Sequence, residues 1–262
     1  MNTDIIILGA NGRMGKILCQ LVKEDKDLTL VGVVSRNTED LSVKNWGCPV
    51  SANLEEALRQ VDDTKKVVII DFSSPANSLN VAHTVAKLGG CLVIGSTGFS
   101  NEERAELKEL AKKTPIFWSS NMSIGVNALL QNLPGLVKAL GSDYDIEIME
   151  IHHNKKKDAP SGTAKMLAEC VATAKDINLD EHVVYTREGI NNARQKDEIG
   201  MQALRGGDVI GVHTVYFLGS GERIEVTHHA HSRETFAQGA LRAAKWLIKQ
   251  KPQTLYCMKD LL

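Results

Sequence analysis

The chain has 262 residues, enough to bury a sizeable core in one large domain or two modest ones. Hydrophobic residues make up 43% and charged residues 24% of it, a composition typical of soluble globular proteins. The 31 basic and 32 acidic side chains leave a formal net charge of −1, so no global electrostatic field favours nucleic acid or an anionic membrane as a partner.

The first stretch of the chain has the pattern of a dinucleotide-binding turn. Residues 4–8 form an apolar, β-branched run that predicts a buried strand, and helical spacing resumes at 16–22. Between them lies Gly9-Ala-Asn-Gly-Arg-Met-Gly15, spaced Gly-x-x-Gly-x-x-Gly in place of the commoner Gly-x-Gly-x-x-Gly. Glycines let the backbone turn tightly and approach a pyrophosphate, which then lies at the helix N-terminus. A glycine turn alone is a weak signal, but its position after the first strand favours cofactor binding.

The next predicted strand, 28–34, ends at the position that selects between two nicotinamide cofactors. Ser35 and Arg36 follow it, where the residue facing the adenosine ribose is expected. A carboxylate there would bind a free 2′-hydroxyl and repel a 2′-phosphate, whereas Arg36 can pair with the phosphate. We therefore expect NADPH to be the preferred cofactor, with NADH still possible because Glu39 and Asp40 lie just beyond.

Short apolar runs continue to alternate with helical patterns up to about residue 122. Helices are predicted at 54–60, 76–88 and 102–113, and strands at 67–72, 91–94 and 116–118. This alternation predicts an α/β domain with a Rossmann-like, doubly wound parallel sheet. Polar turns follow three strands, at 73–75, 95–98 and 119–121. They should face the ligand, because ligands bind at the carboxyl edge of such a sheet.

From about residue 123 the pattern changes. Residues 124–140 look helical, with interruptions expected at Gly125 and Pro134. Four strand-like runs follow, at 144–151, 199–204, 209–218 and 223–230, and 175–197 is polar and irregular. Because no regular helices separate the last three runs, we expect a second, α+β domain built on a mixed or antiparallel sheet.

The last predicted helix, 234–249, is expected to return to the first domain. We therefore expect a dinucleotide-binding domain of 1–122 plus 233–262, and a substrate-binding and oligomerisation domain of 123–232.

The densest polar cluster is Glu150-Ile-His-His-Asn-Lys-Lys-Lys-Asp-Ala-Pro-Ser-Gly-Thr163. It follows the strand predicted at 144–151 and leads into a helix that begins at a Ser or Thr cap. A strand-to-helix loop can present reactive side chains, and the amides of Gly162 and Thr163 could bind a carboxylate at the helix N-terminus. For this cluster alone, a solvated surface loop is an equally good interpretation.

Two other features bear on metals and on compartment. In His228-His-Ala-His231, a strand would bring only His229 and His231 to one face, without an adjacent acid or cysteine, so we predict a solvated sheet edge and no metal. The five cysteines are scattered and form no Cys-x-x-Cys pair, which favours the cytoplasm. The first eight residues lack both a basic start and a long apolar run, so we expect neither a signal peptide nor a membrane span.

Taken together, six motifs resemble the dihydrodipicolinate reductase family of bacterial lysine and diaminopimelate biosynthesis. They are Gly9 to Gly15, Asp71-Phe-Ser-Ser-Pro75, Gly95-Ser-Thr-Gly-Phe99, Ser120-Asn-Met-Ser-Ile-Gly-Val-Asn127, Glu150 to Thr163 and Arg205-Gly-Gly-Asp208. The resemblance covers essentially the whole chain. It implies reduction of the cyclic dicarboxylate 4-hydroxy-tetrahydrodipicolinate to tetrahydrodipicolinate, with loss of water, by NADPH or NADH. It also implies a homotetramer assembled through the sheet of the second domain.

The resemblance also assigns roles to individual residues. His152 matches the catalytic proton donor and Lys156 a second donor that also binds substrate. The other substrate-binding positions are His153, Ser161, Gly162 and Thr163. The pyrophosphate turn comprises Gly9, Ala10, Asn11, Gly12, Arg13 and Met14, and the nicotinamide side comprises Gly95, Ser96, Thr97, Ser119, Ser120, Asn121 and Met122. Phe72 is a further cofactor-binding position. Arg36 matches the adenosine phosphate position, and Ser35 stands where members that use NADH often carry an acid.

These roles agree with elementary chemistry. Hydride delivery to an electron-poor ring leaves negative charge, which an imidazole can neutralise by giving a proton and Lys156 can stabilise by its charge. One alternative is another NAD(P)-linked dehydrogenase of an amino-acid-derived acid, such as homoserine or aspartate dehydrogenase, but it has no evident use for the central motif. Another is a non-catalytic NADPH-sensing regulator, against which the intact His152 and Lys156 argue.

Overall fold

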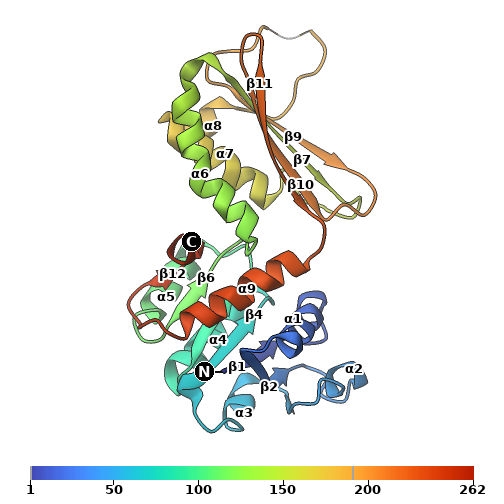
Figure 1. Cartoon of the computed structure of the whole chain (residues 1–262), viewed down its shortest axis with the longest axis vertical. Coiled ribbons are helices and arrows are strands. Elements are labelled where there is room, and N and C mark those ends of the chain that lie inside the picture. Colours follow the sequence, from blue (N-terminus) through green and yellow to red (C-terminus); the bar gives the residue numbers. More distant parts are fainter. Residues whose placement is uncertain (1, 191) are drawn as a thin grey trace. The chain divides into compact units, whose positions relative to one another are not determined.

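The computed structural model describes residues 2–190 and 192–262, and the chain forms two compact units (Figure 1). Unit 1 comprises Met1–Ile124 and Arg233–Leu262, and unit 2 comprises Gly125–Ser232. Met1 and Asn191 lie outside the described residues, and Asn191 belongs to the segment predicted to be irregular. In the described part of the chain, no helix is long and apolar enough to cross a membrane.

Unit 1 is built on a seven-stranded parallel sheet with the order β12-β6-β5-β4-β1-β2-β3. Its strands are β1 (Thr3–Leu8), β2 (Leu28–Val34), β3 (Val50–Ser51), β4 (Val67–Asp71), β5 (Cys91–Ile94), β6 (Ile116–Trp118) and β12 (Leu255–Tyr256). The chain moves outward in one direction from β1 and in the other from β4, so the sheet is doubly wound and the order reverses between these strands. The predicted Rossmann-like fold is confirmed.

Both faces of this sheet are covered by helices. They are α1 (Arg13–Glu24), α2 (Leu41–Lys44), α3 (Leu54–Leu58), α4 (Pro75–Leu88), α5 (Asn101–Leu110), α9 (Glu234–Leu247) and α10 (Met258–Leu261), with a 3₁₀ turn at Thr64–Lys66. Ile5 and Ile7 of β1 pack in the cluster beneath α1 and α9, whereas Ile6 and Leu8 pack in the cluster beneath α3, α4 and α5. Successive side chains on a strand point to opposite faces, so one apolar run supplies both cores.

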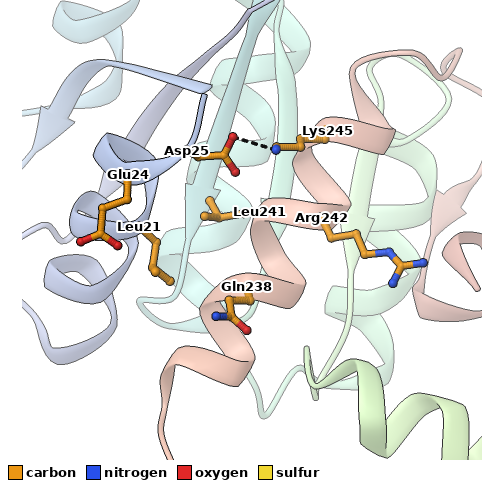
Figure 2. A pocket seen from close by; sticks show the side chains of 7 residues that line it. All are labelled: Leu21, Glu24, Asp25, Gln238, Leu241, Arg242 and Lys245. Atoms are coloured by element: carbon orange, nitrogen blue, oxygen red, sulfur yellow. Dashed lines mark hydrogen bonds and ion pairs between the residues drawn. The ribbon is translucent and has the colours of Figure 1, made fainter. Parts of the chain in front are cut away.

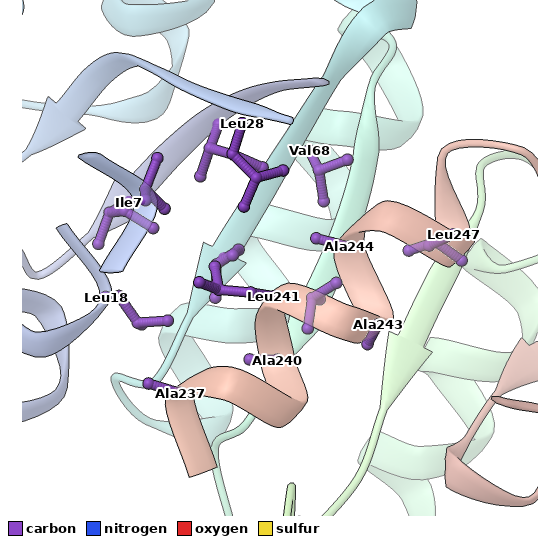
Figure 3. Close-up of a cluster of buried hydrophobic side chains, with 14 of the residues drawn as sticks. Ile7, Leu18, Leu28, Val68, Ala237, Ala240, Leu241, Ala243, Ala244 and Leu247 are labelled. Atoms are coloured by element: carbon purple, nitrogen blue, oxygen red, sulfur yellow. The ribbon is translucent and has the colours of Figure 1, made fainter. Parts of the chain in front are cut away.

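Helix α9 belongs to unit 1 together with the seven-stranded sheet. Its small side chains, among them Ala240 and Ala244, lie against the sheet and contribute to the cluster in Figure 3. A Cβ at Gly239 would collide with the backbone oxygen of Met122, so the helix needs a glycine there. Figure 2 shows a surface pocket beside this helix, across which Lys245 forms an ion pair with Asp25 at 2.7 Å.

Unit 2 contains a five-stranded sheet with the order β11-β10-β7-β9-β8. Its strands are β7 (Asp145–His152), β8 (Val183–Val184), β9 (Ile199–Arg205), β10 (Gly211–Leu218) and β11 (Arg223–Ala230). Strand β10 is antiparallel to β7 and β11, whereas β9 is parallel to β7 and β8. The sheet is therefore mixed, and the predicted second α+β domain architecture is confirmed.

Helices α6 (Ile124–Leu140), α7 (Gly162–Lys175) and α8 (Leu179–His182) complete unit 2 with a 3₁₀ turn at Gly141–Asp143; only the first residue of α6 belongs to unit 1. The predicted interruptions of α6 at Gly125 and Pro134 are wrong, because the helix is continuous. Pro134 has no N–H to offer to the carbonyl of Leu130. The Sγ of Cys170, on α7, donates to that oxygen at 3.4 Å and replaces the missing partner.

The sheet of unit 2 has two unlike faces. Ile146 and Ile148 of β7 pack with α6 and α7, and the strand alternation continues on the same face to Glu150 and His152. The opposite face carries half-buried or exposed side chains, such as Leu204 and Leu218, which are 46% and 36% exposed.

The segment predicted to be irregular, 175–197, is held to the sheet by arginines. Arg187 donates from both terminal nitrogens to the carboxylate of Glu147, at 3.0 and 2.9 Å, and Arg194 donates to Asp145 at 2.7 Å. A Cβ at Gly200 would collide with that same Glu147 carboxylate, so β9 leaves room for this side chain. The segment thus has a structural role that its sequence pattern does not indicate.

Candidate active site

A buried pair of side chains ends β7. Glu150 is 0% exposed and His152 is 9% exposed, and Nδ1 of His152 lies 2.6 Å from Oε2 of Glu150. An ionised carboxylate can only accept a hydrogen bond, so Nδ1 carries the proton of a neutral imidazole. The Nε2 atom is then the one that takes up or releases a proton.

Glu150 also receives donors from two other elements. Arg205, at the end of β9, donates from its terminal nitrogens to both oxygens of Glu150, at 2.7 Å each. The backbone N–H of Ser161 donates to Oε1 at 2.9 Å. The parallel register of β7 and β9 pairs His152 with Arg205, which explains how residues distant in sequence meet at one carboxylate.

The environment changes the pKa of both members of the pair. Burial raises the pKa of Glu150, but hydrogen bonds from Arg205, His152 and Ser161 outweigh it, so the pKa lies below its ordinary value. Burial lowers the pKa of His152, the hydrogen bond and charge of Glu150 oppose this effect, and the pKa stays below its ordinary value. A lower pKa makes the protonated imidazole a stronger acid.

His213 of β10 is a neighbour that the sequence reasoning missed. Its ring is T-shaped against that of His152, with centroids 5.1 Å apart, and its Nε2 lies 2.9 Å from Oγ of Ser161. Burial lowers the pKa of His213 to about 4, so the ring is neutral near neutral pH. It faces Glu150 in the register of β10 and β7, on the strand side that also carries Val215, and this pairing is visible only in the structure.

The helix after the polar loop begins where it was predicted. Ser161 is the N-cap of α7, and its Oγ accepts from the N–H of Ala164 at 3.2 Å. Gly162 and Thr163 are the first helical residues, and the first turn contains no acidic side chain. The positive end of a helix dipole attracts anions, and the Glu150 carboxylate already accepts from the N–H of the N-cap, Ser161.

The polar loop itself is partly ordered by its own side chains. Nζ of Lys156 forms an ion pair with Asp158 at 2.9 Å, and the two side chains are 20% and 64% exposed. The N–H of His153 donates to the carbonyl of Val209 at 2.8 Å, which extends the sheet hydrogen bonds by one residue. The predicted substrate-binding residues thus gather around the end of β7 and the start of α7.

In unit 1, the glycine turn leads directly into α1. Gly9 has a φ of +67°, in the left-handed region that favours glycine, and the N–H of Gly12 donates to its carbonyl at 2.8 Å. A Cβ at residue 15 would collide with the backbone of Gly9, so the third glycine permits close packing of helix and turn. Asn11, Gly12 and Arg13 are exposed, whereas Ala10 is buried and can meet a ligand only through its backbone.

The other predicted cofactor positions follow β4, β5 and β6, which are adjacent in the sheet. The ring of Phe72 lies against Gly95, where a Cβ would collide with it. Ser119 donates to the carbonyl of Asn121 at 2.7 Å, and Thr97 and Ser120 are exposed in the same turns. Met122 is 1% exposed and packs in the core, so its side chain stabilises the fold.

A short chain of hydrogen bonds lies behind these turns. Asp71, at the end of β4, is buried, and Ser78 donates to its Oδ2 at 2.6 Å. Oγ of Ser78 lies 2.9 Å from Oγ of Ser96. Burial raises the pKa of Asp71, and hydrogen bonds from Ser73 and Ser78 oppose that effect. The network holds the hydroxyl of Ser96 at the carboxyl edge of the sheet.

The residues at the end of β2 differ in exposure. Arg36 is exposed, whereas Ser35 is buried and donates to the carbonyl of Asn37 at 3.1 Å. Glu39 forms an ion pair with Lys44, and Asp40 accepts from the N–H of Ser42 at 2.9 Å as the N-cap of α2. These are the two acids that made NADH a possible cofactor, and each one already has a partner close to it in the chain.

His229 lies on β11 and His231 just beyond its end, and their rings are stacked with centroids 6.1 Å apart, so they share a face as predicted. Strand β11 is an edge strand. Within residues 2–190 and 192–262, no group of three His, Cys, Asp or Glu side chains has an arrangement that could hold a metal ion.

Comparisons with known proteins cover both units. Residues 3–122 match the family model "Dihydrodipicolinate reductase, N-terminus", and residues 125–262 match "Dihydrodipicolinate reductase, C-terminus". The chain is 53% identical to the 4-hydroxy-tetrahydrodipicolinate reductase of Oleidesulfovibrio alaskensis over 262 residues, which is 100% of each chain. It is 46% identical to the enzyme of that name from Lawsonia intracellularis, again over 100% of each chain.

Solved structures agree in fold. Dipicolinate-bound dihydrodipicolinate reductase from Paenisporosarcina sp. TG-14 matches with a TM-score of 0.78 at 24% identity, over 100% of each chain. Scyllo-inositol dehydrogenase from Lactobacillus casei, solved with NAD(H) and scyllo-inositol, matches with a TM-score of 0.61 at 14% identity, over 95% of this chain and 88% of the other. At these identities the likeness concerns the fold alone.

Proposed function

Because this chain belongs to the dihydrodipicolinate reductase family, we propose that unit 1 binds the nicotinamide cofactor and unit 2 binds a cyclic dicarboxylate and supplies a proton. The chain is an NAD(P)H-dependent oxidoreductase, and its reaction is the reduction of 4-hydroxy-tetrahydrodipicolinate, with loss of water, in lysine and diaminopimelate biosynthesis. The observation that carries the proposal is that both family models match, one over residues 3–122 and the other over residues 125–262. In addition, the candidate proton donor, His152, is buried against a carboxylate.

His152 is the proposed proton donor. The reduced nicotinamide supplies the hydride when it is bound, and the negative charge left on the ring must be neutralised. Nδ1 of His152 is engaged by Glu150 at 2.6 Å, so Nε2 is the nitrogen that can give a proton. The pKa of this imidazole is lowered by burial, which favours proton release once the charged form is present.

The proposed carboxylate site is formed by Lys156, His153 and the N-terminus of α7. Lys156 has a carboxylate partner already, because Asp158 lies 2.9 Å from its Nζ. A substrate carboxylate would replace this exposed partner, and the first amides of α7, at Gly162 and Thr163, would bind the other carboxylate. The relative solved with dipicolinate carries a cyclic dicarboxylate, which supports this class of ligand.

NADPH is the proposed preferred cofactor, and NADH is a possible substitute. Arg36 is exposed and can pair with a 2′-phosphate. Glu39 pairs with Lys44 and Asp40 caps α2, so neither acid offers its carboxylate without losing a local partner. These contacts support the phosphate-binding interpretation of the end of β2.

We also propose that the chain forms a homotetramer through the sheet of unit 2 and works in the cytoplasm. Leu204 and Leu218, on the face opposite α6 and α7, are 46% and 36% exposed, which a second copy would cover. None of the five cysteines forms a disulfide in the structure, in keeping with a reducing compartment. Light scattering of the purified chain tests the tetramer, and a monomer at micromolar concentration would exclude it.

The reaction is tested by following NADPH absorbance with purified protein, with and without the dicarboxylate that the synthase makes in situ from pyruvate and aspartate semialdehyde. We expect oxidation only when the dicarboxylate forms. The same assay with NADH gives the ratio of the two kcat/KM values. Protein that binds NADPH but never oxidises it would instead favour a cofactor-sensing regulator.

A further inference from the structure

Glu150 has no role in the proposed reaction, yet it is a fully buried acid beside the proposed proton donor. We propose that Glu150 is a positioning residue that fixes the proton of His152 on Nδ1 and ties this ring to the N-terminus of α7. The proposal rests on the proposed function, in which His152 gives a proton from Nε2 and α7 binds a carboxylate.

The first argument is that every acceptor site of Glu150 is used. Its Oε2 accepts from His152 at 2.6 Å and from Arg205 at 2.7 Å. Its Oε1 accepts from Ser161 at 2.9 Å and from Arg205 at 2.7 Å. Two carboxylate oxygens have about four lone-pair sites in all, so the side chain is held in one orientation. A group held in one orientation can fix the orientation of its partners.

The second argument concerns the charge on His152. Lys156 in the following loop and Arg205 on β9 both disfavour a protonated imidazole, and Glu150 on the same strand favours it. His213 on β10 also faces the ring and is neutral at neutral pH. Glu150 therefore keeps the pKa of His152 from falling further, in an environment that otherwise opposes the charged acid.

The third argument is that one carboxylate joins two functional parts of unit 2. The N–H of Ser161, the N-cap of α7, donates to the oxygen beside the one that holds His152. A glutamine could not reproduce this arrangement, because its amide nitrogen donates and would face a donor of Arg205, His152 or Ser161. Of the two side chains, only the carboxylate of glutamate can accept from all four donors at once.

A matched control is present on the same strand. Glu147 of β7 is also held by the two terminal nitrogens of an arginine, Arg187, at 3.0 and 2.9 Å. It points to the opposite face of the sheet from Glu150, because the two lie three positions apart on one strand and side chains alternate between the faces. A change at Glu147 therefore removes a similar ion pair without touching His152.

The test compares Glu150→Gln with Glu147→Gln in the full-length protein. For Glu150→Gln we expect kcat to fall roughly tenfold to a hundredfold, the scale of a lost orienting partner, with NADPH affinity unchanged. The loss of rate with rising pH should begin at a lower pH, because the pKa of His152 falls without the carboxylate. Glu147→Gln should keep the kcat and the pH profile of the wild type.

A second readout does not depend on activity. In protein labelled with ¹⁵N-histidine, NMR should show the proton of neutral His152 on Nδ1, and Glu150→Gln should lower its pKa or move the proton to Nε2. Glu150→Asp is the second variant if Glu150→Gln does not fold. It keeps the charge but is one methylene shorter, so kcat should fall with little change in the pH profile.

An unchanged His152 titration and tautomer in Glu150→Gln, or equal losses of kcat in Glu150→Gln and Glu147→Gln, would overturn the positioning role. Full activity of His152→Gln would instead remove His152 as the proposed proton donor, whatever the NMR titration shows, and absence of substrate-dependent NADPH oxidation by the wild type would overturn the proposed function. The two failures are thus distinguishable.

Discussion

His152 and Lys156 are held in different ways, although both lie near one end of β7. His152 is buried and fixed by a carboxylate, whereas Lys156 is partly exposed and paired with the exposed Asp158. A fixed ring suits a group that must deliver a proton to one atom. A lysine that can exchange its carboxylate partner for a carboxylate of the ligand is suited to binding a charged substrate. Replacing the two residues should therefore change kcat and KM in different ways.

His152→Gln is expected to lower kcat by roughly a hundredfold or more, the scale of a lost general acid. NADPH affinity should not change, because the residues expected to bind the cofactor lie in unit 1. Steady-state kinetics together with fluorescence titration of NADPH measure both quantities. Near-normal turnover would remove His152 from the mechanism.

Lys156→Ala is expected to raise KM and to lower kcat, because the lysine is proposed both to bind a carboxylate and to stabilise developing negative charge. Lys155→Ala is the control, since Lys155 is an exposed neighbour in the same loop. Its kinetic constants should match those of the wild type. Equal effects of the two substitutions would indicate that only the total charge of the loop matters.

Arg36→Ala is expected to reduce kcat/KM for NADPH by roughly tenfold or more, the scale of a lost hydrogen-bonded charge pair. The value for NADH should change little, because that cofactor has no 2′-phosphate. The comparison of the two cofactors on one variant serves as its own control. Parallel losses with both cofactors would contradict phosphate recognition by Arg36.

At the scale of the element, α6 shows how a helix can contain a proline. Pro134 leaves the carbonyl of Leu130 without its usual helical donor, and Cys170 of α7 donates to it at 3.4 Å. The helix therefore depends on its neighbour for one hydrogen bond. A pattern confined to residues 124–140 cannot reveal a donor that comes from another helix.

Cys170→Ala is expected to lower the free energy of unfolding by about 1 kcal/mol, the typical net contribution of one hydrogen bond. Cys170→Ser keeps a donor of similar size and should lose less. Urea titrations of the two variants give the comparison. If both lose the same free energy, packing of the sulfur and not its hydrogen bond stabilises this helix.

At the scale of the whole molecule, the buried histidine of β10 should make stability depend on pH. Burial lowers the pKa of His213 to about 4, against an ordinary value of 6.5. Between these pH values the unfolded chain binds a proton at this residue and the folded chain does not, so the free energy of unfolding falls as the pH falls. The expected loss from this residue is roughly 3 kcal/mol between pH 6.5 and pH 4.

Denaturant titrations at several pH values measure this dependence. The groups around His213 are Glu150, His152, Lys156 and His228, and their own titration adds to the observed slope. The contribution of His213 is therefore obtained as the difference between the wild type and His213→Gln, which should have the shallower slope.

The sequence by itself determined the fold of both units to a large extent, because the signals are local. Apolar runs, helical spacing and the glycine turn predicted every strand of unit 1 longer than two residues, and the alternation at 144–151 predicted β7. Very short elements such as α2, β3 and β12 were missed, since two to four residues show no periodicity. The prediction that α6 is interrupted was wrong, because Cys170 donates to the carbonyl that Pro134 leaves without a helical donor.

The roles of the predicted site residues stay predictions. The contacts that surround these residues were decided by the tertiary structure. Arg205 lies 55 residues from Glu150 in the sequence, and His213 lies 52 residues from Ser161. Only the strand order and register of the mixed sheet bring these pairs together, and no local pattern carries that information. The sequence determined which residues stand at the ends of strands and helices. The tertiary structure decided which of them share a carboxylate, because burial and long-range pairing set their hydrogen bonds and the direction in which each pKa moves.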